Sequence, residues 1–229
     1  MINIKSILIK ESEKTLVNIS FDIEKSTALI GESGSGKSLT IKSLLNLLPS
    51  NLKADILIDC EFELNSQSIG FVPQNPFTSL SPLTKIKNQF FVDKQRQIEL
   101  LSLVGLDESL LDRFPSELSG GQLQRVIIAI SISNNPKLLL LDEPTTALDT
   151  KSKELIMELI KRISKELDIK ILFVTHDIAT ITDICDDIVI IKNGQVVERG
   201  ITKHILQNPV NEYTKQLIES NFKYREKRA

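Results

Sequence analysis

Residues 138–149 read LLLLDEPTTALD, and this stretch decides the fold class. Four leucines run directly into Asp142 and Glu143 and then into a turn. A short, continuous apolar run that ends in turn residues is typical of a strand buried on both faces. The stretch therefore predicts a buried strand that places two carboxylates at its carboxyl end.

A second motif lies upstream, where residues 31–38 read GESGSGKS. It fits the phosphate-binding pattern G-x-x-x-x-G-K-[ST], between an apolar strand (27–30) and a helix that we expect over 37–48. Glycines let backbone N–H groups surround phosphate oxygens, Lys37 adds a positive charge, and Ser38 offers a hydroxyl to Mg²⁺. The motif predicts binding of ATP or GTP. The residues expected to contact the nucleotide are Gly31, Ser33, Gly34, Ser35, Gly36, Lys37, Ser38 and Leu39.

Three further segments carry polar residues at the ends of predicted elements. LSGGQ, residues 118–122, is a glycine turn that opens an apolar helix, and a helix start is again an anion site. Gln74 stands in FVPQNP and His176 in FVTHD, each at the end of a predicted strand. In this order, the five segments resemble the ATP-binding subunit of ABC transporters, over Asn3 to about Ser220.

The resemblance implies an α/β fold, the P-loop NTPase cassette. Its parts are a RecA-like core with a mainly parallel sheet, an N-terminal antiparallel β-subdomain and an inserted helical subdomain. We expect one domain over 1–229, with the core in 1–74 and 135–229 and the helical subdomain in 75–134.

The resemblance also assigns catalytic roles. Asp142, with Ser38 and Gln74, is expected to hold Mg²⁺. Glu143 would orient and polarise the attacking water, and His176 would contact the γ-phosphate and Glu143. Phosphoryl transfer to water needs these functions: charge neutralisation, an aligned water and a group that polarises it.

A second subunit is implied by LSGGQ. In the family this segment closes over ATP bound by the facing subunit, so Ser119, Gly121 and Gln122 are expected to complete a partner's site. Asp149 would lie between the two sites and couple them. The working form is then a head-to-tail dimer of ATPases, either identical or related.

Composition bears on three further questions: nucleic-acid binding, cysteine chemistry and membrane insertion. The formal charge of −2 gives no basic field, which disfavours nucleic acid as a partner. Cys60 and Cys185 lack metal-ligand spacing, and both are expected to be buried thiols. No signal-peptide pattern opens the chain, and no apolar run reaches the roughly 20 residues of a membrane span. The resemblance to ABC transporter ATPases therefore implies a peripheral protein at the cytoplasmic face of the membrane, bound to two membrane-spanning permease subunits and, through them, to an extracytoplasmic binding protein.

Two segments indicate a subfamily. Residues 74–83, QNPFTSLSPL, and 208–218, NPVNEYTKQLI, are similar to stretches of ATPases that drive oligopeptide, dipeptide and nickel importers. Because peptide-transport members usually continue well beyond the Y-T motif, we expect nickel or a metal chelate as substrate, with di- or oligopeptides as the alternative. An ABC ATPase outside transport, in DNA repair or translation, and an inactive nucleotide-binding partner remain as alternatives. The single cassette argues against an ABC ATPase outside transport. The presence of Glu143, His176 and LSGGQ argues against an inactive partner.

Overall fold

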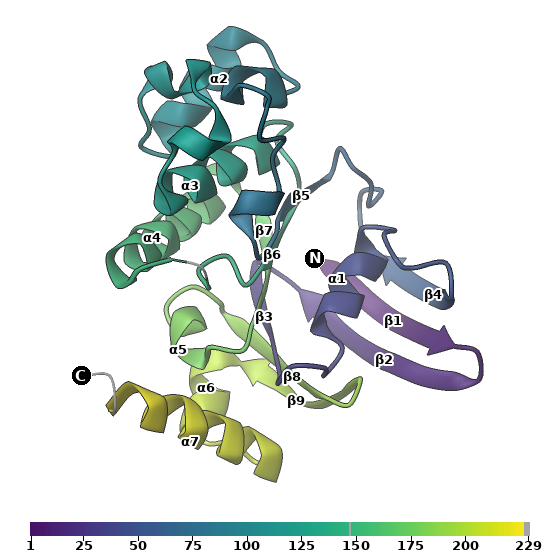
Figure 1. Ribbon diagram of the computed structural model, residues 1–229. Helices are drawn as coiled ribbons and strands as arrows, with labels where there is room; N and C mark the ends of the chain where they lie inside the picture. The colour runs from purple at the N-terminus through teal and green to yellow at the C-terminus, as the bar shows by residue number, and fades with distance from the viewer. Residues whose placement is uncertain (147, 227–229) are drawn as a thin grey trace. The chain divides into compact units, whose positions relative to one another are not determined.

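The computed structural model describes residues 1–146 and 148–226, and the chain divides into two compact units. Unit 1 comprises residues 1–65 and 170–229, and unit 2 comprises residues 66–169. Figure 1 shows the helices and strands of both units. The predicted boundaries of the core and of the helical subdomain stay a prediction.

Unit 1 is built on strands in the order β4-β1-β2-β9-β8-β3-β7. Strand β3 pairs in parallel with both β7 and β8, whereas β1 pairs antiparallel with β2 and β4 (Figure 1). The predicted antiparallel N-terminal part and parallel core strands are confirmed. The elements of unit 1 are β1 (Ile2–Glu11), β2 (Lys14–Ile23), β3 (Ser26–Ile30), α1 (Lys37–Leu44), β4 (Leu52–Asp59), β7 (Lys170–Thr175), α5 (Ile178–Ile181), β8 (Asp187–Lys192), β9 (Gln195–Ile201), α6 (Thr202–Gln207) and α7 (Glu212–Glu226).

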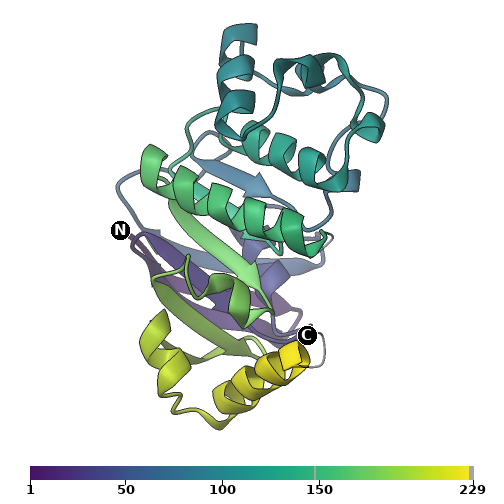
Figure 2. The same cartoon turned by 90° about the vertical axis from the view of Figure 1, so that its left-hand side faces the viewer.

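Unit 2 holds a pair of parallel strands together with α-helices and short 3-10 helices. Its elements are β5 (Ile69–Val72), the 3-10 helices η1 (Pro76–Thr78), η2 (Ile86–Gln89), η3 (Glu108–Asp112) and η4 (Pro115–Glu117), α2 (Lys94–Leu103), α3 (Gly120–Ser131), β6 (Leu138–Asp142) and α4 (Thr150–Leu167). Helix α4 buries Ile156, Leu159, Ile160 and Ile163, which recur at the spacing of one helix face, and it packs beside α3 (Figure 2).

Several predicted boundaries were wrong, each for a local reason. The helix expected over 37–48 ends at Leu44, because Asn46 adopts φ 56° and the N–H of Leu47 bonds to Lys42 O at 2.8 Å. This is the Schellman arrangement that closes helices. The sequence ADILIDCEFEL, residues 54–64, predicts a strand over its whole length, whereas β4 stops at Asp59, where its pairing with β1 ends at Asn3. The C-terminal sequence predicts a helix over 212–220, whereas α7 continues to Glu226.

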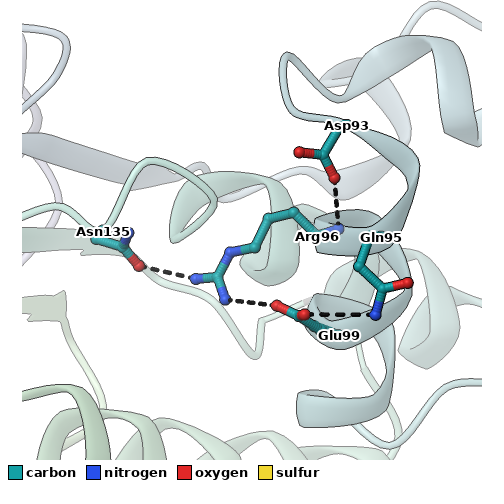
Figure 3. Close-up of polar contacts among 5 residues, drawn as sticks. All are labelled: Asp93, Gln95, Arg96, Glu99 and Asn135. Carbon is teal, nitrogen blue, oxygen red and sulfur yellow. Dashed lines mark hydrogen bonds and ion pairs between the residues drawn. The ribbon is translucent and has the colours of Figure 1, made fainter.

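In residues 86–106 the apolar side chains recur at helical spacing and predict one helix, but the structure divides this segment. Helix α2 begins only after Asp93, whose carboxylate accepts the N–H of Arg96 at 2.9 Å as an N-cap (Figure 3). Arg96 also joins α2 to the turn before β6, since its guanidinium donates to Asn135 at 2.8 Å and to Glu99 at 3.2 Å.

The two thiols differ in their burial. Cys185 is buried as expected, whereas Cys60 is only half-buried, so the prediction was wrong for Cys60. It lies just beyond the end of β4, and its thiol donates to Phe62 O. Among the described residues, no helix is both long enough and apolar enough to cross a membrane.

Candidate functional site

The predicted site residues are divided between the two units. Unit 1 carries the phosphate loop, defined here as residues 31–38, and His176. Unit 2 carries Gln74, the carboxylates Asp142 and Glu143, the LSGGQ turn and Asp149.

The phosphate loop joins a buried strand to an uncapped helix. All five residues of β3 are buried, and α1 starts from Gly36, which has φ 111° and offers no side-chain cap. A Cβ at Gly36 would approach Val17 Cγ2 to 2.8 Å, so the positive φ and the tight packing both require glycine there. The first N–H groups of α1 therefore have no side-chain partner of the usual capping kind, which is the arrangement that suits a bound phosphate.

Lys37 lies inside the loop and is buried. Its ammonium donates to Gly31 O at 2.6 Å and to Glu32 O at 2.9 Å. The hydroxyl of Ser35 is also buried and has no hydrogen-bond partner within the described structure. A buried hydroxyl without a partner is costly, and a phosphate oxygen would satisfy it. The loop therefore presents a cation, an unsatisfied hydroxyl and a helix start, while Ser33, Gly34 and Ser38 are exposed.

The carboxylate pair lies at the end of β6, as predicted. Leu138, Leu139, Leu140 and Leu141 are fully buried, and Asp142 is half-buried. Glu143 follows with φ 46°, a left-handed conformation that is uncommon for a residue with a side chain. Such conformations often occur where the surrounding structure holds a functional side chain in place.

Two neighbours hold the Glu143 side chain. Gln74 Nε2 donates to Glu143 Oε2 at 3.1 Å, and Thr146 Oγ1 donates to the same oxygen at 3.0 Å. Strands β5 and β6 are parallel, with Val72 opposite Leu141, so Gln74 and Glu143 leave the same edge of the pair. The structure thus brings together two residues that the sequence assigned to one site.

His176 follows β7, and its side chain is exposed. The next residue, Asp177, caps α5 by accepting the N–H of Ala179 at 3.0 Å. His176 therefore occupies the predicted position at a strand end, and its contact with a γ-phosphate stays a prediction.

The LSGGQ turn closes on itself as a capping box. Ser119 Oγ accepts the N–H of Gln122 at 3.3 Å, and Gln122 Oε1 accepts the N–H of Ser119 at 3.0 Å. A Cβ added at Gly121 would lie 3.0 Å from Ser152 Oγ, so the turn passes close to the first turn of α4.

Asp149 is the N-cap of α4. Its carboxylate accepts the Ser152 hydroxyl at 2.6 Å and the Ser152 N–H at 3.0 Å. The hydrogen bond from the Ser152 side chain, followed by that from its backbone, lowers the pKa of Asp149. Ser152 thus links the predicted coupling residue Asp149 to Gly121 of the LSGGQ turn, a connection that the sequence did not indicate.

The residues present could supply part of the coordination shell of Mg²⁺, with the remaining ligands coming from phosphates and waters. No group of three or more His, Cys, Asp or Glu residues that could hold a metal occurs among residues 1–146 and 148–226. Mg²⁺ in nucleotide sites is held by one or two protein oxygens together with phosphates and waters. The Ser38 hydroxyl of unit 1 and the Asp142 carboxylate of unit 2 are each an oxygen group of this type, and their binding of Mg²⁺ stays a prediction.

Sequence reasoning missed Thr146, Ser152 and Tyr213. The first two stand three residues after Glu143 and Asp149, at the spacing typical of turns and caps, so a local signal was present. No local signal pointed to Tyr213. Its hydroxyl accepts the N–H of Glu32, which is 181 positions away in the sequence.

Comparison with known proteins places this arrangement in a family. The family model "ABC transporter" matches residues 16–146. The oligopeptide transport ATP-binding protein OppD of Bacillus subtilis (strain 168) is 37% identical over 232 residues, which cover 89% of this chain and 65% of that protein. The methionine import ATP-binding protein MetN of Helicobacter acinonychis is 36% identical, over 93% of this chain and 71% of that one. The dipeptide transport ATP-binding protein DppD of Haemophilus influenzae is 35% identical, over 90% and 72%.

Solved structures also show similarity to ABC transporter ATPases. The cbiO1 protein of Clostridium perfringens, described as part of an ABC transporter complex, superposes with a TM-score of 0.78 at 28% identity, over 90% of each chain. An ATP-binding cassette in a dimeric, post-hydrolysis state with ADP and Pi superposes with a TM-score of 0.71 at 28% identity, over 88% of this chain and 99% of that one. The predicted fold class is thereby confirmed. From its motifs, its fold and these relatives, the chain belongs to the ABC transporter family and has the fold of that family's ATPase domain.

Proposed function

We propose that this chain is the ATP-binding and ATP-hydrolysing subunit of an ABC importer for oligopeptides or dipeptides. Support comes from the relatives named for oligopeptide and dipeptide transport and from residues 74–83 and 208–218. The expectation of nickel rested on where the sequence ends. Because the chain spans 65% of the length of the Bacillus relative, its end carries no information on the substrate. Nickel is therefore the second candidate, and it is included in the uptake test.

ATP binding is assigned to the phosphate loop. The start of α1, the Lys37 ammonium and the Ser35 hydroxyl would together neutralise and hydrogen-bond the phosphates. Ser38 and Asp142, with Gln74, would hold Mg²⁺. When bound, this ion supplies positive charge against the phosphate oxygens.

Hydrolysis is assigned to Glu143, and its hydrogen bond from Gln74 is the observation that carries the proposal. A general base must be held in a defined direction before it can polarise a water. The bonds from Gln74 and Thr146 converge on Oε2 and fix the carboxylate plane.

We assign the second ATPase subunit and the permease subunit to two different surfaces of this chain. The LSGGQ turn would contact ATP on a second ATPase subunit in a head-to-tail dimer. In unit 2, Phe77, Leu83 and Phe91 are large apolar residues that are 59%, 89% and 91% exposed. We assign these three, named here the apolar surface of unit 2, to the contact with a membrane-spanning permease subunit. The protein would then lie at the cytoplasmic face of the membrane, with a substrate-binding protein on the other side.

The test is Glu143→Gln, which keeps the size of the side chain and removes the base. We expect ATP hydrolysis to fall by about 10²- to 10⁴-fold, the usual contribution of general-base catalysis, while ATP still binds. Glu158→Gln, an exposed change on α4 of the same unit, is the matched control and should leave hydrolysis unchanged. A Glu143→Gln protein with normal hydrolysis would remove Glu143 from its assigned role.

The substrate is tested by uptake into cells. Labelled dipeptide and labelled nickel are offered to cells with the gene intact, deleted, or carrying Glu143→Gln. Loss of dipeptide uptake alone in both altered strains supports the proposal. Loss of nickel uptake alone would transfer the assignment to nickel, and normal uptake of both would exclude both substrates.

A further inference from the structure

Tyr213 contacts the phosphate loop from the far end of unit 1. The N–H of Glu32, the second residue of the loop, donates to the Tyr213 hydroxyl at 3.1 Å. The tyrosine is only 7% exposed. It stands within residues 208–218, the segment that indicated a subfamily but that ATP chemistry left without a role.

The position of Tyr213 is fixed by its own surroundings. Its N–H bonds to the side chain of Asn211 at 2.9 Å. The carboxylate of Glu198, on β9, accepts the N–H groups of Val210 at 2.8 Å and Asn211 at 3.1 Å, which ties the start of α7 to the sheet. On the ring face, the Lys192 ammonium lies 4.4 Å from the ring centroid, in the range of a cation–π contact.

The turn between β8 and β9, which directly follows Lys192, also contacts the phosphate loop. The N–H of Gly194 donates to Ser35 O at 2.9 Å. On the same side, a Cβ at Gly31 would come within 2.4 Å of Ile191 O, so the backbones lie in close contact. The loop is thus held at Ser35 by this turn and at Glu32 by Tyr213.

We propose that Tyr213 is a positioning residue for ATP binding, whose hydroxyl holds the Glu32 N–H so that the phosphate loop is ordered before the nucleotide arrives. This rests on the proposed function, because it takes the loop to be the ATP site. Fixing a backbone segment in advance removes part of the entropy cost of binding. Tyr213 touches neither the nucleotide phosphates nor the water in this role, so its effect is on affinity.

Tyr213→Phe is the direct test, since it keeps the ring beneath Lys192 and removes only the hydroxyl. The dissociation constant of ATP is measured by calorimetry on the full chain, and the melting temperature is measured without nucleotide. We expect ATP to bind roughly three- to tenfold more weakly, the size of one net hydrogen bond, with the melting temperature unchanged. Ser220→Ala is the matched control, because it removes a hydroxyl from α7 that donates to Leu217 O in the same helix, and it should leave both values unchanged.

Lys37→Ala separates failure of this inference from failure of the proposed site. If wild type binds ATP, Lys37→Ala does not, and Tyr213→Phe binds as tightly as wild type, the role of Tyr213 is overturned alone. A fall in melting temperature that accounts for the lost affinity would also overturn it, because the hydroxyl would then stabilise the fold in general. If Lys37→Ala binds ATP as well as wild type, the loop is not the ATP site and both proposals fall.

Discussion

Gln74 and Glu143 are 69 residues apart in the sequence, and the side-chain amide of the first donates to the carboxylate of the second at 3.1 Å. The parallel pairing of β5 with β6 creates this contact, because both residues follow the carboxyl ends of paired strands. Glu143 accepts a second bond, from Thr146, on the same oxygen. The direction of the proposed base therefore depends on two neutral donors.

Removal of the Gln74 donor should slow hydrolysis without preventing ATP binding. For Gln74→Ala we expect kcat to fall at least about tenfold, a part of the full contribution of a general base, because Glu143 loses the hydrogen bond from Gln74 that helps to orient it. ATPase assays at saturating ATP measure the effect. Gln95→Ala, an exposed change on α2, serves as control. An unchanged kcat in Gln74→Ala would show that the hydrogen bond from Gln74 is not needed to orient the carboxylate.

The leucines of β6 should dominate the stability of unit 2. Leu139 is fully buried, so Leu139→Ala should lower the free energy of unfolding by about 2–5 kcal/mol, through lost burial and the cavity left behind. Leu155→Ala on α4 is the matched control: its side chain is 49% exposed, and the change should cost less than about 1 kcal/mol. Urea unfolding of the two variants compares them, and equal midpoints would contradict the difference.

The sequence predicted those features that are encoded locally. The run Leu138 to Leu141 indicated a buried strand, and the glycines of residues 31–38 indicated a loop before a helix, because period and turn chemistry act over a few residues. The late start of α2 also had a local signal, the N-cap Asp93, which the apolar period concealed. The bond from Glu32 to Tyr213 had none, because only the folded sheet brings the two residues together.

The two cysteines should differ in reactivity. Burial raises the pKa of the Cys185 thiol, with the nearby charges of Asp186 and Asp187 as further causes, so little reactive thiolate forms. Cys60 is half-buried and within reach of reagent. Alkylation of the native protein at pH 8, followed by mass spectrometry, should modify Cys60 well before Cys185, and denaturation should remove the difference. The Cys60→Ser variant should show almost no fast labelling; fast labelling that persists would mean that Cys185 is accessible.

The apolar surface of unit 2 should be needed for assembly and not for ATP binding. Phe91 is 91% exposed, so Phe91→Ser removes apolar area without disturbing a core. We expect less of the variant to co-purify with membrane subunits, while its ATP affinity stays that of wild type. Val210→Ser, at an 83% exposed residue of unit 1, controls for the loss of an exposed apolar side chain. Equal recovery of Phe91→Ser and wild type would exclude this surface as the permease contact.

Glu198 should make the stability of unit 1 depend on acid pH. Burial alone would raise the pKa of Glu198, but the N–H groups of Val210 and Asn211, which it accepts, and the charge of Lys215 help to outweigh burial, so that the pKa lies below the ordinary value of 4.5. A carboxyl whose pKa is lowered by folding stabilises the native state above its unfolded pKa, and this contribution disappears as the pH falls through the folded pKa. Thermal unfolding of wild type and Glu198→Gln is therefore compared between pH 7 and pH 3. The two proteins should show a gap in melting temperature at neutral pH, and this gap should narrow below about pH 4.5.

Glu13→Gln, an exposed change in the turn between β1 and β2, controls for the loss of one negative charge and should not reproduce that gap. Its curve should follow wild type over the whole range, because charge loss at an exposed site changes stability little. If the Glu198→Gln gap stays constant down to pH 3, the carboxylate charge is not what ties the start of α7 to β9. Neutral hydrogen bonding by the side chain would then suffice, since a protonated carboxyl can still accept the N–H groups of Val210 and Asn211.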